Sequence, residues 1–122
     1  KKSNKSFYHE LDNTLFSATS STFIGKVYAD FGLKNIADAA SNADDGGYPQ
    51  LQNEFLIASN PNIIFLADAQ YGEDANKVAL RPGWSEISAV KTMKIISLPA
   101  DVSSRWGPRI IDFYRIVADA LS

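Results

Sequence analysis

The sequence predicts an α/β fold, a three-layer sandwich with a small, mainly parallel sheet of about four strands. Residues 48–66 carry most of this prediction, because they read as a loop, a short helix and a buried strand in succession. Apolar residues at helical spacing predict the helix over about 52–59. Asn60-Pro61 ends it, since proline lacks an N–H and disfavours helix at the preceding residue. The following strand, 62–66, contains an uninterrupted apolar run, which is typical of a strand covered on both faces.

The elements on either side complete an alternating pattern. A strand is predicted at 7–11. The four hydroxyl residues 19–22 precede an apolar periodic run, which predicts a helix over about 22–31 with a hydroxyl N-cap and Gly32 as its stop. Weaker patterns predict five further elements. Residues 14–18, before the hydroxyl residues, are predicted to form a second strand or extended segment, and residues 36–40 a short element. Later in the chain come an exposed helix at 73–80, an irregular helical turn at 84–90 and a strand at 94–98.

The last helix has the strongest pattern. Gly107-Pro108 opens it, with proline in the first turn, where its missing N–H costs nothing. Its predicted apolar stripe consists of Ile110, Ile111, Tyr114, Val117, Ala118 and Leu121.

The composition is that of an ordinary globular domain. The 122 residues are 45% hydrophobic and 21% charged, which is enough for one domain with a core and argues against disorder. The net charge of -2, with both signs mixed, argues against a nucleic-acid surface. Cysteine is absent and His9 is the single histidine, so disulfides, thiol catalysis and most multi-histidine metal sites are excluded. We expect no resident cofactor or metal.

No catalytic motif supports an enzyme. Phosphate loops, dinucleotide fingerprints and the nucleophile elbow are missing, and a Ser–His–acid triad would require His9, in a strand at the N-terminal end. The carboxylate pairs Asp44-Asp45 and Glu73-Asp74 are expected to be solvated rather than to act as acid and base.

Loops at the ends of elements instead carry aromatics, hydroxyls and an arginine, which suit a bulky ligand in the crevice of an α/β sheet. These loops are 19–22, 48, 68–71 and 105–106, and the candidate ligand contacts are Ser20, Ser21, Tyr48, Arg105 and Trp106. Each has a plain structural alternative. The hydroxyls can cap a helix, Tyr48 can anchor its loop, and Trp106 can cover the last helix.

Seven short motifs follow one another along nearly the whole chain: 7–10, 21–25, 32–37, 48–54, 60–64, 81–84 with 89–91, and 105–109. Together they resemble the C-terminal lobe of a class III periplasmic-type solute-binding protein, the binding component of ABC importers for cobalamin, iron–siderophores and haem. Three positions depart from the family pattern, with Tyr48 for Trp, Gln52 for the usual Ser N-cap, and Asn62 for Asp. The missing cap predicts a less well fixed helix start.

The resemblance implies roles for the candidate residues. Tyr48 falls on an aromatic that lines the ligand cleft, and Arg105 and Trp106 fall in the loop that borders it. Glu54 falls on the glutamate that projects from the lobe tip and pairs with arginines of the membrane permease. Without the resemblance, Glu54 is equally well explained by the helix dipole, which favours an early carboxylate by ~0.3–1 kcal/mol.

The resemblance also implies an organisation. We expect residues 1–6 to be a disordered tail or the end of an inter-lobe helix, and residues 7–122 to be the C-terminal lobe of a two-lobe protein whose N-terminal lobe is missing. The implied function is to capture an iron–siderophore, haem or cobalamin-like ligand and deliver it to ABC permease subunits. The implied location is extracytoplasmic, either periplasmic or lipid-anchored.

Two alternatives remain. One is a stand-alone α/β interaction or sensory domain without a transport role, which would lack an N-terminal lobe. The other is a zinc or manganese binder of the related cluster type, which would need several His and carboxylate ligands where this lobe offers only His9.

Overall fold

The computed structural model describes residues 5–40, 46–69, 72–98 and 110–121. A four-stranded parallel sheet forms its centre, with the strand order β2-β1-β3-β4. The strands are β1 (Ser6–Glu10), β2 (Lys34–Asn35), β3 (Ile63–Leu66) and β4 (Ile95–Ser97). The predicted three-layer α/β fold is therefore confirmed.

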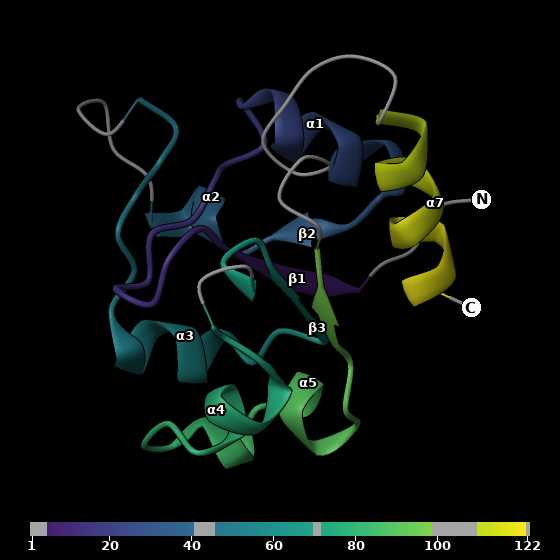
Figure 1. Cartoon of the computed structure of the whole chain (residues 1–122). Helices are drawn as coiled ribbons and strands as arrows, with labels where there is room; N and C mark the ends of the chain where they lie inside the picture. The colour runs from purple at the N-terminus through teal and green to yellow at the C-terminus, as the bar shows by residue number, and fades with distance from the viewer. Residues whose placement is uncertain (1–4, 41–45, 70–71, 99–109, 122) are drawn as a thin grey trace.

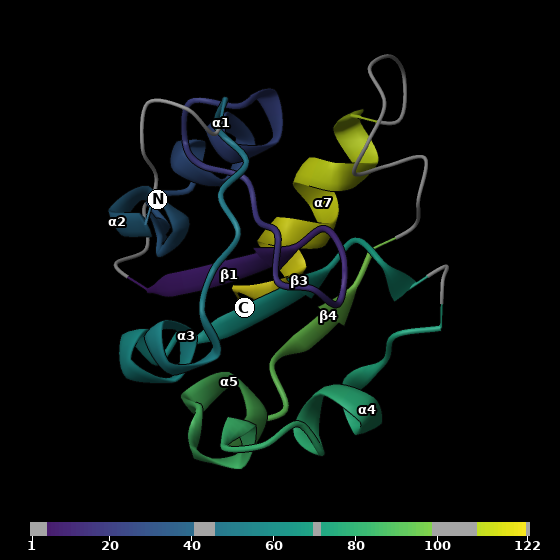
Figure 2. The same ribbon diagram turned by 90° about the vertical axis from the view of Figure 1, so that its left-hand side faces the viewer.

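Helices cover both faces of the sheet (Figures 1 and 2). One face is covered by α1 (Phe23–Asp30) and α7 (Ile110–Ala120). The other face is covered by α2 (Ala37–Ala40), α3 (Asn53–Ser59), α4 (Ala75–Ala79), the 3-10 helix η2 (Trp84–Glu86) and α5 (Ser88–Lys91). None of the helices within the described ranges is long and apolar enough to cross a membrane.

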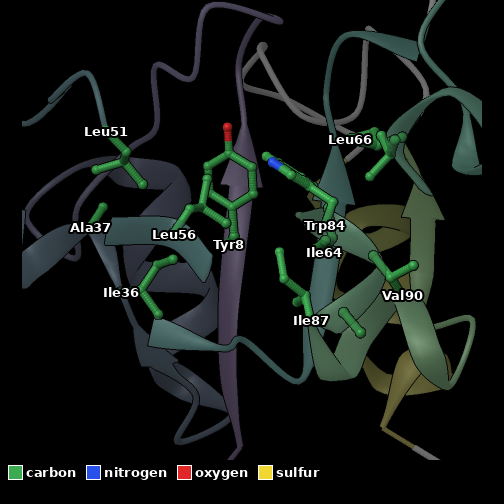
Figure 3. Packing of buried hydrophobic residues seen from close by; sticks show 12 residues of the cluster. Tyr8, Ile36, Ala37, Leu51, Leu56, Ile64, Leu66, Trp84, Ile87 and Val90 are labelled. Atoms are coloured by element: carbon green, nitrogen blue, oxygen red, sulfur yellow. The ribbon is translucent and has the colours of Figure 1, made fainter. Parts of the chain in front are cut away.

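Each face of the sheet has its own apolar core, because successive side chains of a strand point to opposite sides. In β3, Ile64 and Leu66 join one core while Ile63 and Phe65 join the other. All four are essentially buried, as the uninterrupted apolar run predicts. Figure 3 shows the first core, in which Tyr8 of β1 lies beside Trp84 of η2.

One strand of the sheet was not predicted, and one predicted segment is not a strand. Residues 14–18 form the extended segment that was the other expectation, because Leu15 adopts a positive φ of 75° and the pairing of the segment includes a single isolated bridge, between Phe16 and Gln50. The second strand of the sheet is instead β2, which pairs Lys34 and Asn35 with the start of β1. A two-residue polar strand shows no apolar alternation, so the sequence pattern did not reveal it.

The termini of the predicted elements also shift. Ser6 already belongs to β1 and hydrogen-bonds through its N–H to Asn62 Oδ1 at 3.0 Å, so Ser6 is not part of the expected tail, of which residues 1–4 lie outside the described residues. In α7, Val117 is buried as predicted, but Ala118 is exposed. Phe113 and Ala120 take the core positions instead. The predicted opening Gly107-Pro108 lies outside the described residues.

Candidate functional site

An antiparallel ribbon leaves the sheet at the carboxyl end of β1. Its two segments, residues 11–19 and 47–51, run side by side between α1 and α3 (Figures 1 and 2). Three backbone hydrogen bonds join them, from Leu51 N–H to the Leu15 carbonyl, from Ser17 N–H to the Pro49 carbonyl and from Thr19 N–H to the Gly47 carbonyl, at 2.8–2.9 Å. In α/β sheets, ligands bind at this edge, outside the carboxyl ends of the strands.

The ribbon carries two aromatic side chains on its outer face. Phe16 is 36% exposed and Tyr48 is 47% exposed. Phe16 pairs with Gln50 across the ribbon, and residues two apart on an extended segment point to the same side, so Phe16 and Tyr48 are diagonal neighbours. Tyr48 was among the predicted ligand contacts, but Phe16 was not. No local pattern marks Phe16, because only its bridge to Gln50 places it beside Tyr48.

The hydroxyl segment before α1 mainly holds structure together. Thr22 is the N-cap of α1, and its Oγ1 accepts from the Gly25 N–H at 2.9 Å. Ser20 bonds Asp38 through both its N–H, at 2.9 Å, and its hydroxyl, at 2.8 Å. Thr22 therefore has the expected capping role, whereas the ligand contacts of Ser20 and Ser21 stay predictions. Ser21 is exposed, with its Oγ 2.7 Å from Thr19 Oγ1.

Two glycines allow this segment to pack closely. A Cβ on Gly25 would lie 1.9 Å from the Thr19 carbonyl oxygen, so the first turn of α1 rests directly on the loop before it. A Cβ on Gly47 would lie 2.9 Å from Thr22 Cγ2 and 3.1 Å from Ser21 Oγ. Ser21 is thereby held next to the residue that precedes Tyr48, and the structure brings these two candidates to one end of the ribbon.

A buried ion pair fixes the base of the ribbon. Arg81 donates to Glu10, the last residue of β1, from Nη1 at 2.6 Å and from Nη2 at 2.8 Å, and Nη2 also meets Glu73 at 2.9 Å. Burial lowers the pKa of Arg81, but its hydrogen bonds with Glu10 and Glu73 outweigh this and raise it above the ordinary value. The expectation that Glu73 is solvated is wrong, because Glu73 is half-buried in this cluster.

The adjacent carboxylates of Glu73 and Asp74 make different contacts. Asp74 is the N-cap of α4 and accepts from the Lys77 N–H at 2.9 Å, while Glu73 accepts from Arg81. Both carboxylates thus make structural hydrogen bonds. The other pair, Asp44-Asp45, lies outside the described residues. The cluster was not predicted, although a carboxylate at the end of a buried strand was its signal in the sequence.

Two further ionisable groups are buried near β1 and β3. Among the described residues, neither oxygen of Asp68 has a hydrogen-bond partner, and neither does His9 Nε2. Burial, followed by the neighbouring Glu10 carboxylate, raises the pKa of Asp68 to about 8. Burial lowers the pKa of His9 to about 4, and its Nδ1 lies 2.6 Å from the Tyr28 hydroxyl. Burial thus favours the neutral form of both side chains.

Glu54 lies apart from the ribbon, exposed in the first turn of α3. Its helix lacks a side-chain cap, because Gln52 at the N-cap makes no such hydrogen bond within the described part of the chain. That agrees with the substitution of the usual serine. Arg105 and Trp106 lie outside the described residues, so their places at the cleft stay predictions, as does docking by Glu54.

A hollow of about 540 Å³ lies away from the ribbon, between β4 and α7, and includes Lys94, Ile96 and Ile116 in its lining. It contains none of the predicted site residues. Across the described ranges, no three His, Asp or Glu side chains gather as they would around a metal ion. The exposed Phe16 and Tyr48 give the ribbon an aromatic outer face, which suits one wall of a cleft.

The sequence matches the family model described as periplasmic binding protein over residues 1–102. It is 31% identical to an uncharacterized ABC transporter substrate-binding lipoprotein, YvrC, of Bacillus subtilis, over 99% of this chain and 37% of that protein.

Solved structures show the same fold. One is a possible iron-binding periplasmic solute-binding protein from Staphylococcus epidermidis, with a TM-score of 0.82 and 23% identity over 99% of this chain and 46% of that one. Another is the periplasmic vitamin B12-binding protein BtuF of Vibrio cholerae, with a TM-score of 0.76 and 21% identity over 99% of this chain and 45% of that one. The chain thus spans less than half the length of each of these proteins.

Proposed function

The chain belongs to the periplasmic binding protein family, and from this premise we propose that the whole protein is the solute-binding component of an ABC importer. Members of this family are extracytoplasmic or surface-anchored, in agreement with the location that the sequence analysis expects. The protein takes up a bulky ligand, an iron–siderophore, haem or a cobalamin-like compound, and delivers it to a membrane permease. The ligand is cargo and not a resident cofactor. The role is binding and delivery rather than catalysis.

The observation that carries this proposal is the exposed aromatic pair Phe16 and Tyr48 at the carboxyl edge of the sheet. Aromatic side chains offer a large apolar face with few rotatable bonds, which favours flat or bulky ligands over small hydrophilic ones. The wall they form is open, so a second lobe is needed to enclose the ligand. A missing N-terminal lobe supplies that second wall.

The residues at the ribbon favour a bulky ligand over a bare metal ion. A bare zinc or manganese ion needs several nitrogen or carboxylate donors at one point, and the buried carboxylate Glu10 is already bonded by Arg81. Among the similar solved structures, one is a possible iron-binding protein and another is a vitamin B12-binding protein. The choice within the bulky class is therefore left to a binding experiment.

We assign the exposed Glu54 to docking on the permease. The carboxylate projects from a short helix on the sheet face opposite α1 and α7, where an arginine of a partner can reach it. Exposed charge pairs of this kind steer association and set register more than they add affinity. Replacing Glu54 by Ala should therefore leave ligand binding intact and slow transport, and unchanged uptake in cells would remove this role.

The test of the proposal uses the two-lobe protein with ferric siderophores, haem and cobalamin as separate probes. Tryptophan fluorescence is followed during titration, and circular dichroism confirms that the protein is folded. Saturable quenching by one of the three classes supports the proposal. A folded two-lobe protein that none of them quenches would overturn it and would favour the alternative of an interaction or sensory domain.

A further inference from the structure

The helix α3 is anchored at both ends by one neighbouring segment, residues 82–89. At the N-terminal end, the Asn53 side chain bonds this segment twice. At the C-terminal end, Asn60 adopts a left-handed φ of 50°, and its Oδ1 accepts from the Ser88 N–H at 2.7 Å. The Ala89 N–H donates to the Pro61 carbonyl at 3.1 Å. Because Gln52 provides no side-chain N-cap among the residues that the structure describes, these bonds to residues 82–89 fix the N-terminal end of α3, and they reinforce the C-cap at Asn60.

The anchor at Asn53 uses both ends of its amide. Trp84 Nε1 donates to Asn53 Oδ1 at 2.6 Å, and Asn53 Nδ2 donates to the Pro82 carbonyl at 3.2 Å. One turn further along α3, Ile57 packs against Gly83, where an added Cβ would lie 2.6 Å from Ile57 Cδ1. The turn at 82–84 therefore touches α3 at two positions on the same helical face.

The turn is in its own right fixed to the sheet. Trp84 is fully buried and packs edge-on against Tyr8 of β1, with ring centroids 6.1 Å apart (Figure 3). The Arg81 guanidinium lies 4.5 Å from the centroid of the Trp84 ring while it holds Glu10 at the end of β1. A continuous set of contacts therefore runs from the sheet through Trp84 to Asn53.

We propose that Asn53 is a positioning residue for Glu54, and that Trp84 and the Pro82 carbonyl hold Asn53 for that purpose. Glu54 is the next residue along the uncapped first turn of α3, so the turn that Asn53 fixes is the one that aims the exposed carboxylate. A helix start without a cap frays unless other bonds hold it. The partner is a cationic, arginine-bearing surface of a membrane protein, and the inference rests on the docking role proposed for Glu54.

The experiment measures the affinity of the ligand-free two-lobe protein for its cognate ABC permease in lipid nanodiscs. We expect Asn53→Ala to weaken binding roughly two- to tenfold, the range that corresponds to losing about one net hydrogen bond. Trp84→Phe keeps most of the ring but removes the N–H donor, and it should weaken binding in the same direction. Asn60→Gly is the matched control, because it breaks the other anchor of α3 but keeps the left-handed backbone accessible.

Urea unfolding of each variant separates loss of stability from loss of orientation. The proposal is supported when Asn53→Ala weakens docking more than Asn60→Gly does at comparable stability, and when it has no further effect in a Glu54→Ala background. Equal docking of the two asparagine variants would overturn it. So would additive effects of the Asn53 and Glu54 changes, since Asn53 would then contact the partner directly. If Glu54→Ala by itself leaves docking unchanged, the docking role fails first, and the positioning role falls with it.

Discussion

Arg81 forms a two-pronged ion pair with Glu10, with Nη1 and Nη2 at 2.6 and 2.8 Å from the two carboxylate oxygens. Glu10 is fully buried and ends β1, whereas Arg81 follows α4 far along the chain. The Tyr8 hydroxyl donates to the same carboxylate at 3.1 Å. This ion pair therefore connects the segment after α4 to the end of β1, where the ribbon begins.

Removing Arg81 should therefore destabilise the protein strongly. Arg81→Met leaves Glu10 as a buried charge without its partner, and such losses cost about 3–5 kcal/mol. Urea denaturation at pH 7 measures the free energy of unfolding, and Lys77→Met in the exposed part of α4 is the control. The double variant with Glu10→Gln should recover part of the loss. A cost below about 1 kcal/mol for Arg81→Met would mean that water replaces the guanidinium.

Gly25 tests the close packing between the first turn of α1 and the loop before it. Elsewhere in a helix, a change from glycine to alanine stabilises by up to about 1 kcal/mol, but a Cβ here would lie 1.9 Å from the Thr19 carbonyl oxygen. We expect Gly25→Ala to destabilise by about 1–3 kcal/mol, because the loop must move. Thermal unfolding measures this, with Lys26→Ala on the exposed side of α1 as the control. A stabilised Gly25→Ala protein would show that the loop shifts freely.

Asp68 should make the protein less stable as the pH rises from about 4 to 8. Its pKa is raised from 3.8 to about 8 in the folded state, so the unfolded chain releases this proton at lower pH than the folded chain does. Stability contributed by the protonated form is therefore lost as pH rises from about 4 to 8. Asp68→Asn should remove the fall between pH 6.5 and 8, with Asp12→Asn, an exposed carboxylate, as the control. An unaltered pH profile would show that Asp68 ionises at its ordinary pKa.

His9 should act in the opposite direction. Burial lowers the pKa of His9 from 6.5 to about 4. Between these two pH values, His9 is therefore protonated in the unfolded chain but not in the folded chain. Stability should fall as pH decreases from 6.5 to 4, by about 3 kcal/mol at most. Because Asp68 opposes this trend over the same range, the measurement is sharpest in the Asp68→Asn background. There, His9→Phe should flatten the profile, and a slope that persists would assign the effect to another group.

The fold was predictable from the sequence where one local pattern decides the structure. The apolar run 63–66, the hydroxyl cap at Thr22 and the break at Asn60 each depend on neighbours in the chain, and the structure confirms all three. The two-residue strand β2 was not predictable, because its pairing with β1 depends on the tertiary fold alone.

In the candidate site too, residues with a local pattern could be predicted and residues that meet only through the tertiary fold could not. Tyr48 could be selected because its motif is local, but Phe16 joins it only through the bridge to Gln50. Arg81 and Glu10 are 71 residues apart in sequence, so no spacing rule connects them. The same holds for Asn53 and Trp84. Side chains that meet across such separations become visible only in three dimensions.

The aromatic ribbon provides the last prediction. In the two-lobe protein, Phe16→Ala and Tyr48→Ala should each weaken binding of whichever probe quenches fluorescence, siderophore, haem or cobalamin, by about tenfold, because truncating a contact aromatic typically costs more than 1 kcal/mol. Met93→Ala is the matched control, since Met93 is 63% exposed but precedes β4, at the amino ends of the strands and opposite the ribbon. Isothermal titration measures the affinities. If Tyr48→Ala weakens binding and Phe16→Ala does not, the cleft is formed by the 47–51 segment alone. If neither does, the ribbon is not the ligand wall.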